Sequence, residues 1–125
     1  MTTAISVNKY IYQILSTDSE LKSLVKEKIY PLIAEESTTF PFIIFKRNNI
    51  VTDYTKDGRV NDTVDVSIAI AAKNYNQTVA IAERVRELLE LKRNEYFKMI
   101  QLTSVAEDYV DDAFIQELTF SAIVK

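Results

Sequence analysis

Three pairs of adjacent carboxylates are the residues of this sequence best suited to acid–base chemistry. They are Glu35-Glu36, Glu107-Asp108 and Asp111-Asp112. A general acid or base must lie in a cleft that shifts its pKa. Adjacent residues of a strand point to opposite faces of the sheet, and adjacent residues of a turn are solvated. We therefore expect all three pairs to be structural. No loop has the spacing of a calcium-binding hand, so no carboxylate metal site is predicted.

The other groups on which catalysis or cofactor binding commonly depends are missing from the sequence. The chain has no His, no Cys and one Gly. Thiol nucleophiles, Ser–His triads, disulfides, the usual zinc sites and glycine-rich phosphate loops are therefore excluded. We predict no catalytic, cofactor-binding or metal-binding residues and no cofactor, and we do not expect an enzyme.

The charges are mixed along the chain and give a net charge of −3, from 15 basic and 18 acidic residues. The lysines at positions 22, 26 and 28, for example, lie among Glu20 and Glu27. A duplex-binding protein usually carries a basic excess or a basic stripe, so nucleic-acid binding is not favoured. The chain has seven Tyr and six Phe, but aromatic and basic side chains are seldom interleaved, and Tyr96-Phe97-Lys98 is the best instance. Core packing or a protein interface is therefore favoured over base stacking.

Nothing in the sequence indicates a membrane segment. No apolar stretch approaches the ~20 residues of a bilayer span. The first five residues lack the basic and apolar regions of a signal peptide. We expect a soluble, unprocessed protein without a membrane partner.

Hydrophobic periodicity predicts two helices and two strands in the first half of the chain. Apolar residues at helical spacing predict an amphipathic helix over Ala4–Leu15. Thr17–Glu20 has the form of a capping box, so a short second helix should follow it. Pro31 cannot donate a ladder hydrogen bond, and its stretch is therefore at best a short edge strand. Pro41 opens the next strand, which contains Phe42–Phe45.

The second half of the chain follows a hairpin–helix–hairpin pattern. Alternation of apolar and polar residues places Val64, Val66, Ile68 and Ile70 on one buried strand face. The helix that follows has an apolar stripe opposite its charged residues. The predicted elements are a turn at Lys56–Arg59, a strand from Val60 to about Ala72, a cap at Asn74–Gln77, a helix over Thr78–Leu91, and strands over Tyr96–Tyr109 and Phe114–Val124 joined by a turn at Asp111-Asp112.

These elements predict one α+β domain that spans residues 1–125. Their order is helix, helix, short strand, β-hairpin, helix, β-hairpin. We expect a mainly antiparallel β-sheet of about four to five strands, with two or three helices packed on one face.

Two strands carry apolar residues on both faces, and helices on one side of a sheet cannot cover both. The candidate interface residues are Phe42, Ile43 and Phe45 in one strand and Ile115 and Ile123 in the last. Either a second layer of sheet or another subunit must cover the face without helices. The pattern therefore indicates a homo-oligomer.

The stretch from about Asn48 to Asn61 is polar and rich in turn residues. We expect it to project from the sheet, because loops of this kind commonly carry contacts with partners. Its candidate contact residues are Lys56, Asp57, Gly58 and Arg59.

The chain resembles the tail-completion, or tail-terminator, family of long-tailed, siphovirus-like phages and prophages. The resemblance covers nearly the whole chain, and a lysine stands at position 28 where the family commonly has glycine. The residues that carry it are Ile14-Leu15, Asp18, Leu21, Leu24-Val25, Lys28–Pro31, Pro41–Phe45, Ile68–Ala72, Tyr75 and Ala82–Leu89.

The resemblance implies structural work rather than chemistry. Proteins of this family cap the tail tube, usually as a hexameric ring, and present a surface to head-completion proteins. The implied partners are further copies of the chain, the tail tube protein and a head-completion protein, and the only nucleic acid is DNA passing through the ring lumen. The implied place is the virion tail, reached from the host cytoplasm. Two alternatives stay open, another neck or head–tail connector component and a small-ligand-binding or enzymatic α+β domain.

Overall fold

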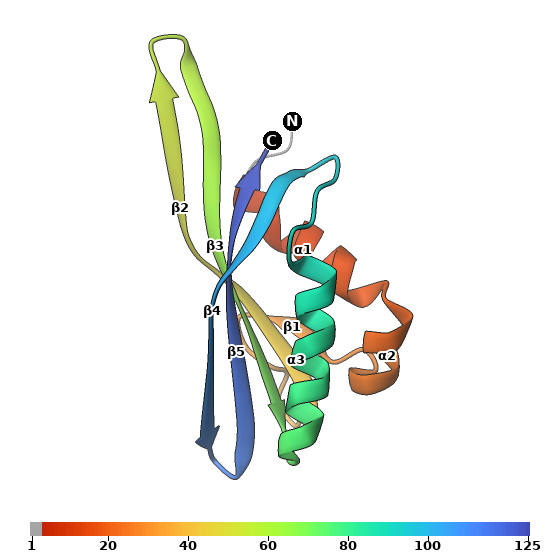
Figure 1. The fold of residues 1–125 in the computed structure, drawn as a ribbon. Helices are drawn as coiled ribbons and strands as arrows, with labels where there is room; N and C mark the ends of the chain where they lie inside the picture. The colour runs from red at the N-terminus through yellow and green to blue at the C-terminus, as the bar shows by residue number, and fades with distance from the viewer. Residues whose placement is uncertain (1–3) are drawn as a thin grey trace.

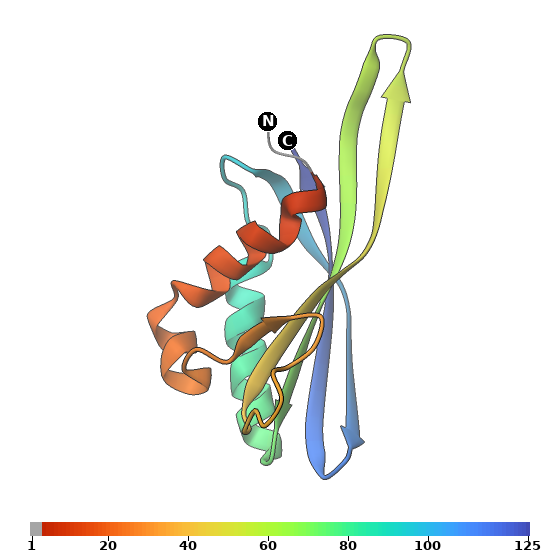
Figure 2. The ribbon, with the colours of Figure 1, turned by 180° about the vertical axis from the view of Figure 1, so that it is seen from behind.

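The computed structural model describes residues 4–125, with the side chains of all but Arg59 and Val60. It confirms the α+β class. A five-stranded sheet has the order β1-β2-β3-β5-β4, and three α-helices cover one of its faces (Figures 1 and 2). The strands are β1 (Ile29–Pro31), β2 (Phe42–Thr55), β3 (Gly58–Ala72), β4 (Phe97–Val110) and β5 (Ala113–Val124), and the helices are η1 (Ala4–Ser6), α1 (Val7–Ser16), α2 (Ser19–Val25) and α3 (Tyr75–Leu89).

The sheet is mainly antiparallel, as expected. Only β1 runs parallel to its neighbour, with Ile29 opposite Ile43 and Pro31 opposite Phe45 on β2. Pro31 ends this three-residue edge strand, in agreement with its missing donor. The other four strands have 12 to 15 residues each, which corresponds to roughly 40–50 Å of extended chain.

The two hairpins project in opposite directions (Figure 1). The β2–β3 hairpin turns at residues 56 and 57, and its flanking pair is Thr55 and Gly58. Gly58 has a φ of +121°, a conformation that side-chain-bearing residues rarely adopt. The β4–β5 hairpin turns at Asp111 and Asp112, whose φ values of 51° and 63° are both positive, as short hairpin turns require. Both predicted turns are confirmed.

Local hydrogen bonds determine where α2 and α3 begin. The N-cap of α2 is Asp18, whose carboxylate accepts a hydrogen bond from the Leu21 N–H at 2.8 Å. The expected cap, Thr17, instead donates its hydroxyl to the Gln13 carbonyl at 2.7 Å and so completes the last turn of α1. Asn74 caps α3 through the Gln77 N–H, as predicted, but the helix begins directly after it and not at position 78.

The core lies between the helical layer and one face of the sheet. Alternate residues of β3, from Val64 to Ile70, are fully buried there, which confirms the period-two prediction. Tyr96 and Phe97 are also buried, and Tyr96 stacks on Tyr10 with ring centroids 3.7 Å apart. The aromatic residues of that segment therefore serve core packing. Of the helices between residues 4 and 125, none is both long and apolar enough to cross a membrane.

Candidate assembly surfaces

No helix among the described residues covers the second face of the sheet, which we call the open face (Figures 1 and 2). Strand register and side-chain alternation define its residues. They are Phe42, Ile44, Lys46, Asn49 and Val51 of β2, Thr63, Asp65, Ser67, Ala69 and Ala71 of β3, Ile115, Glu117, Thr119, Ser121 and Ile123 of β5, and Met99, Gln101, Ser104, Ala106 and Asp108 of β4.

The structure corrects part of the expected interface. The side chains of Ile43 and Phe45 are 0% and 2% exposed, because they point toward the helices and belong to the core. Only Phe42, Ile115 and Ile123 of the five candidates lie on the open face, each of them partly buried. Neighbouring residues of a strand alternate between faces, so a four-residue apolar run necessarily supplies both. Ile44, which the prediction left out, lies on the open face with Phe42.

The apolar residues of the open face form two separate groups, and Ile44 and Ala69 lie in the row next to the first of them. Phe42, Ala71 and Ile115 are neighbours across β2, β3 and β5 at the end of the sheet that carries the β4–β5 hairpin. Ile123 lies eight positions from Ile115, roughly 26 Å along the strand, in a row with Val51, Thr63 and Met99. Polar rows separate the two. The structure therefore does not unite the predicted interface residues in one patch.

The predicted partner-contact hairpin lies beyond the helical layer, at the tip of β2 and β3 (Figure 1). Lys56, Asp57 and Gly58 are exposed there, and the backbone of Arg59 pairs with Tyr54. Tyr54 is 74% exposed on the same hairpin. The four predicted residues are thus brought together at one end of the molecule.

Sequence reasoning missed the opposite hairpin. Residues 103–112 are all exposed, although β4 supplies most of them. Val105, Tyr109 and Val110 are 51%, 55% and 46% exposed. The signal was the weak alternation of this segment, because a strand with no buried face has no reason to alternate.

A groove of about 200 Å³ separates α3 from this part of β4, and Val79, Ala82, Val105 and Leu118 contribute its apolar walls. At one end the Tyr75 hydroxyl donates to a Glu107 oxygen at 2.9 Å, and the Gln116 amide donates to the same oxygen at 3.0 Å. The hydrogen bond to Glu107 raises the pKa of Tyr75. Glu107 lies on the helix side and Asp108 on the open face, as expected for strand neighbours, so this pair does not converge on one site.

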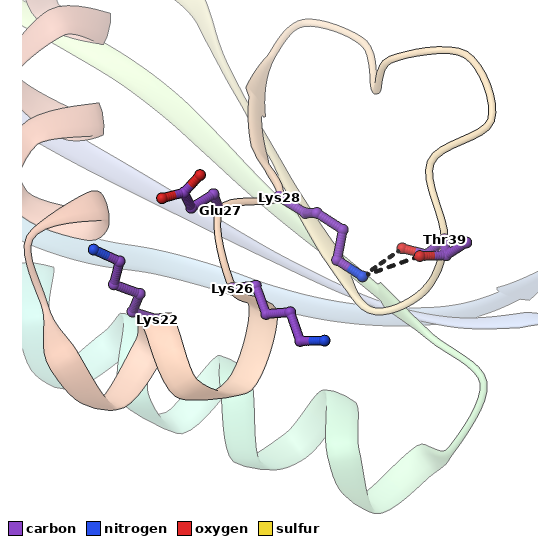
Figure 3. A pocket seen from close by; sticks show the side chains of 5 residues that line it. All are labelled: Lys22, Lys26, Glu27, Lys28 and Thr39. Carbon is purple, nitrogen blue, oxygen red and sulfur yellow. Dashed lines mark hydrogen bonds between the residues drawn. The ribbon is translucent and has the colours of Figure 1, made fainter.

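Three lysines surround a shallow hollow of about 600 Å³ beside α2 (Figure 3). Lys28 Nζ donates to the carbonyl and hydroxyl oxygens of Thr39, at 2.9 and 3.3 Å. The ammonium groups of Lys22 and Lys26 point in other directions, and Glu27 is a further residue of the lining (Figure 3). The side chains therefore do not converge on one anion. Across residues 4–125, no three acidic side chains come together in a group that could hold a metal ion.

Comparison with known proteins gives a consistent assignment. The model of the Tail completion protein gp17 family matches residues 9–125. Among solved structures, a chain of the "Virion of native gene transfer agent (GTA) particle" has the same fold, with a TM-score of 0.77, 19% identity, and coverage of 91% of this chain and 90% of that one. No curated protein matches. The family resemblance read from the sequence is confirmed. The chain belongs to the Tail completion protein gp17 family and is a structural protein of a phage-type virion tail.

Proposed function

We propose that this protein is a tail terminator, one non-enzymatic domain that caps the tail tube as an oligomeric ring and presents the surface to which the head is joined. The observation that carries the proposal is the family match over residues 9–125. Its partners would be other copies of itself, in a favoured ring of six copies in total, together with the tail tube protein and a head-completion protein.

The open face supports self-assembly. Phe42, Ile115 and Ile123 lie on this face and stay partly exposed in the single chain, although the Phe40 ring stacks on Phe42. Burial of apolar surface contributes roughly 25 cal/mol per Å², and association costs several kcal/mol or more. An interface of about 800 Å² per partner would therefore suffice to hold a ring, at high concentration or on the tube.

The two hairpins support a role between two different structures. They project from opposite ends of the sheet (Figure 2). A ring with all copies in one orientation would carry the β2–β3 tips on one side and the β4–β5 tips on the other. We assign the tip formed by Lys56–Arg59 to contacts with a partner, because Lys56, Asp57 and Gly58 are exposed at its turn.

Deletion of the gene in a producing strain tests the proposal. A terminator stops tube growth, so its loss should give tails longer than their set length. Loss of a head–tail connector should instead leave tails of normal length that are not joined to heads, and this result would favour the alternative. Purified protein should show a mass six times that of the 14.4 kDa chain, or an annulus on tail ends in negative stain.

A further inference from the structure

Each edge of the sheet is covered along one half and uncovered along the other. On β2, the strand β1 covers residues 43–45, and Leu32 N–H adds a bond to the Phe45 carbonyl at 2.9 Å. On β4, Leu91 N–H donates to the Ile100 carbonyl at 2.7 Å, and Asn94 N–H donates to the Phe97 carbonyl at 3.0 Å. Within residues 4–125, no backbone hydrogen bond reaches the outer side of residues 46–55 or 101–110.

These two bare edges match in length and direction. Each has ten residues, and each ends where local structure covers the strand. Successive pairs in β2, β3, β5 and β4 are antiparallel, so β2 and β4 run in opposite directions. A copy placed in the same orientation beside β4 would therefore present its β2 antiparallel to it. Residue 46 is level with residue 104 in the sheet, so pairing of the two bare edges displaces the next copy by about six residues along the strands, which strands tilted to the ring axis accommodate. Neither bare edge contains proline, and residues 101–110 contain no Lys or Arg, the residues that commonly protect an exposed edge.

Their charges are complementary in that alignment. The bare β2 edge begins with the exposed residues Lys46 and Arg47, directly after the three residues that β1 covers. The free end of the bare β4 edge carries Asp108 and continues into Asp111 and Asp112. If the two edges pair antiparallel over their whole length, residue 46 lies near residue 110, and Lys46 meets the acidic turn on the open face that also carries Asp108. Arg47 lies on the helix side, where its guanidinium donates to the Ile5 carbonyl at 2.6 Å. Opposite charges across such a contact select its register.

The surroundings of the bare β4 edge fit an added strand. On the helix side lies the groove that Val79, Ala82 and Val105 help to line. On the open face lies a hollow of about 330 Å³ beside Val110 and Ile115. Side chains of an incoming strand alternate between these two sides. The bare β2 edge offers Val51 and Tyr54, which are 54% and 74% exposed in the single chain.

We propose that residues 46–55 of one copy pair as an antiparallel strand with residues 101–110 of the next, so that the sheet continues from copy to copy. Each copy pairs through its bare β2 edge with one neighbour and through its bare β4 edge with the other. This is a head-to-tail contact, which a ring can close. The contact rests on the proposed ring function and names the surfaces that would form it.

Cysteine cross-linking tests this contact, because the natural chain has no Cys. One chain carrying both Asn49→Cys and Ala106→Cys places an exposed thiol on each bare edge, both on the open face. A short bifunctional maleimide is added to the assembled protein, or to purified tails if the free chain is monomeric. We expect a denaturing-gel ladder of multiples of the chain that ends at the ring size. Either single-cysteine chain should stay uncross-linked. The matched control is a Gln13→Cys/Ala106→Cys chain, which has one thiol at an exposed position of α1 and should also give no ladder.

The outcomes separate the two proposals. Dimers from either single-cysteine chain would mean that like edges meet, and would overturn the head-to-tail contact. Rings or capped tails without cross-links would overturn the edge contact and leave the terminator function standing. A chain that neither oligomerises nor enters tails would overturn both. As a further check, Lys46→Glu and Asp108→Lys should each lower the oligomeric fraction, and the two together in one chain should restore it.

Discussion

Arg84 on α3 binds Asp18, the N-cap of α2, although 66 positions separate them in the sequence. Arg84 Nε lies 2.9 Å from Asp18 Oδ2, and the guanidinium also contacts Oδ1. The same carboxylate accepts the Leu21 N–H, so one side chain both starts α2 and holds it against α3. Glu20 and Glu87 each place an oxygen 3.1 Å from Arg84. This pair therefore links two helices of the layer that covers the core.

Replacement of Asp18 by Ala should lower the free energy of unfolding by about 1–2 kcal/mol, the usual loss when a helix cap is removed. Asp18→Asn should cost less than Asp18→Ala, because asparagine keeps the helix cap and loses only the ion pair with Arg84, whereas alanine loses both. Urea denaturation of both variants measures the difference. Arg86→Ala is the control, since Arg86 pairs with Glu90 on the exposed surface of the same helix, and its midpoint should stay nearly unchanged. Equal effects of all three substitutions would contradict the assigned role of Asp18.

The Asp18 pair also predicts an acid-sensitive stability. Hydrogen bonding from Arg84, together with that from the Leu21 N–H, lowers the Asp18 pKa below its ordinary value of 3.8. A carboxyl with a lowered folded-state pKa stabilises the fold at pH values above 3.8, and this contribution is lost as pH falls through the lowered value. We expect the urea midpoint to fall more steeply for the natural chain than for Asp18→Asn between about pH 5 and about pH 2. Parallel curves would show that Asp18 titrates alike in both states.

Ile43 and Ile44 provide a matched test of the two faces of the sheet. Ile43 is fully buried under the helices, whereas Ile44 points to the open face and is partly buried. Ile43→Ala should lower the free energy of unfolding by about 2–5 kcal/mol, through lost burial and the cavity it leaves. Ile44→Ala should cost clearly less in the free chain. Chemical denaturation at a concentration where the chain is monomeric gives both values, and a reversed order would contradict the assignment of faces.

The β2–β3 tip should matter for joining and not for folding. Lys56 and Asp57 form the exposed turn, and Gly58 supplies its positive φ. Replacing Lys56 and Arg59 together by Ala should leave the melting temperature nearly unchanged but reduce the fraction of tails joined to heads. Thermal melting and counts of joined particles in electron micrographs measure the two effects. If folding and joining fall together, the hairpin belongs to the stable body of the domain.

A charge at Ile115 should separate folding from assembly. Ile115 is partly buried on the open face, in the apolar row with Phe42 and Ala71. Ile115→Asp should give a folded monomer that does not cap tails, because an unpaired charge would be buried in the contact. Ser121→Asp is the control, since Ser121 lies on the same strand and face but in a polar row. Circular dichroism shows whether each variant is folded, and light scattering measures the mass of each in solution. An oligomer of Ile115→Asp as stable as the control would exclude this row from the contact.

Local patterns predicted most of the fold because their physical causes are local. The alternation through Val64–Ile70 predicted a one-sided strand, and Asp111-Asp112 predicted a turn. The choice between Thr17 and Asp18 as cap was not predictable from the pattern, because it depends on Arg84 far along the chain.

The candidate surfaces were less predictable than the fold. The run Phe42–Phe45 indicates that both faces are apolar, but it does not say which residues point to the helices. The bare edges depend on how far β1 and the loop after α3 reach along their neighbours, a fact of tertiary structure that no single segment encodes.

The opposite directions of the two hairpins have a consequence for growth. A tube lengthens by repeated stacking when the two sides of each disc are complementary to one another. In a ring of equally oriented copies of this chain, Lys56 and Asp57 would repeat along one rim and the Asp111-Asp112 pair toward the other. Such a disc has a front and a back of different chemistry. A ring of this kind would stop growth after one layer when one rim fits the last layer of the tube and the other rim is not complementary to the first, since two different rims do not by themselves prevent stacking.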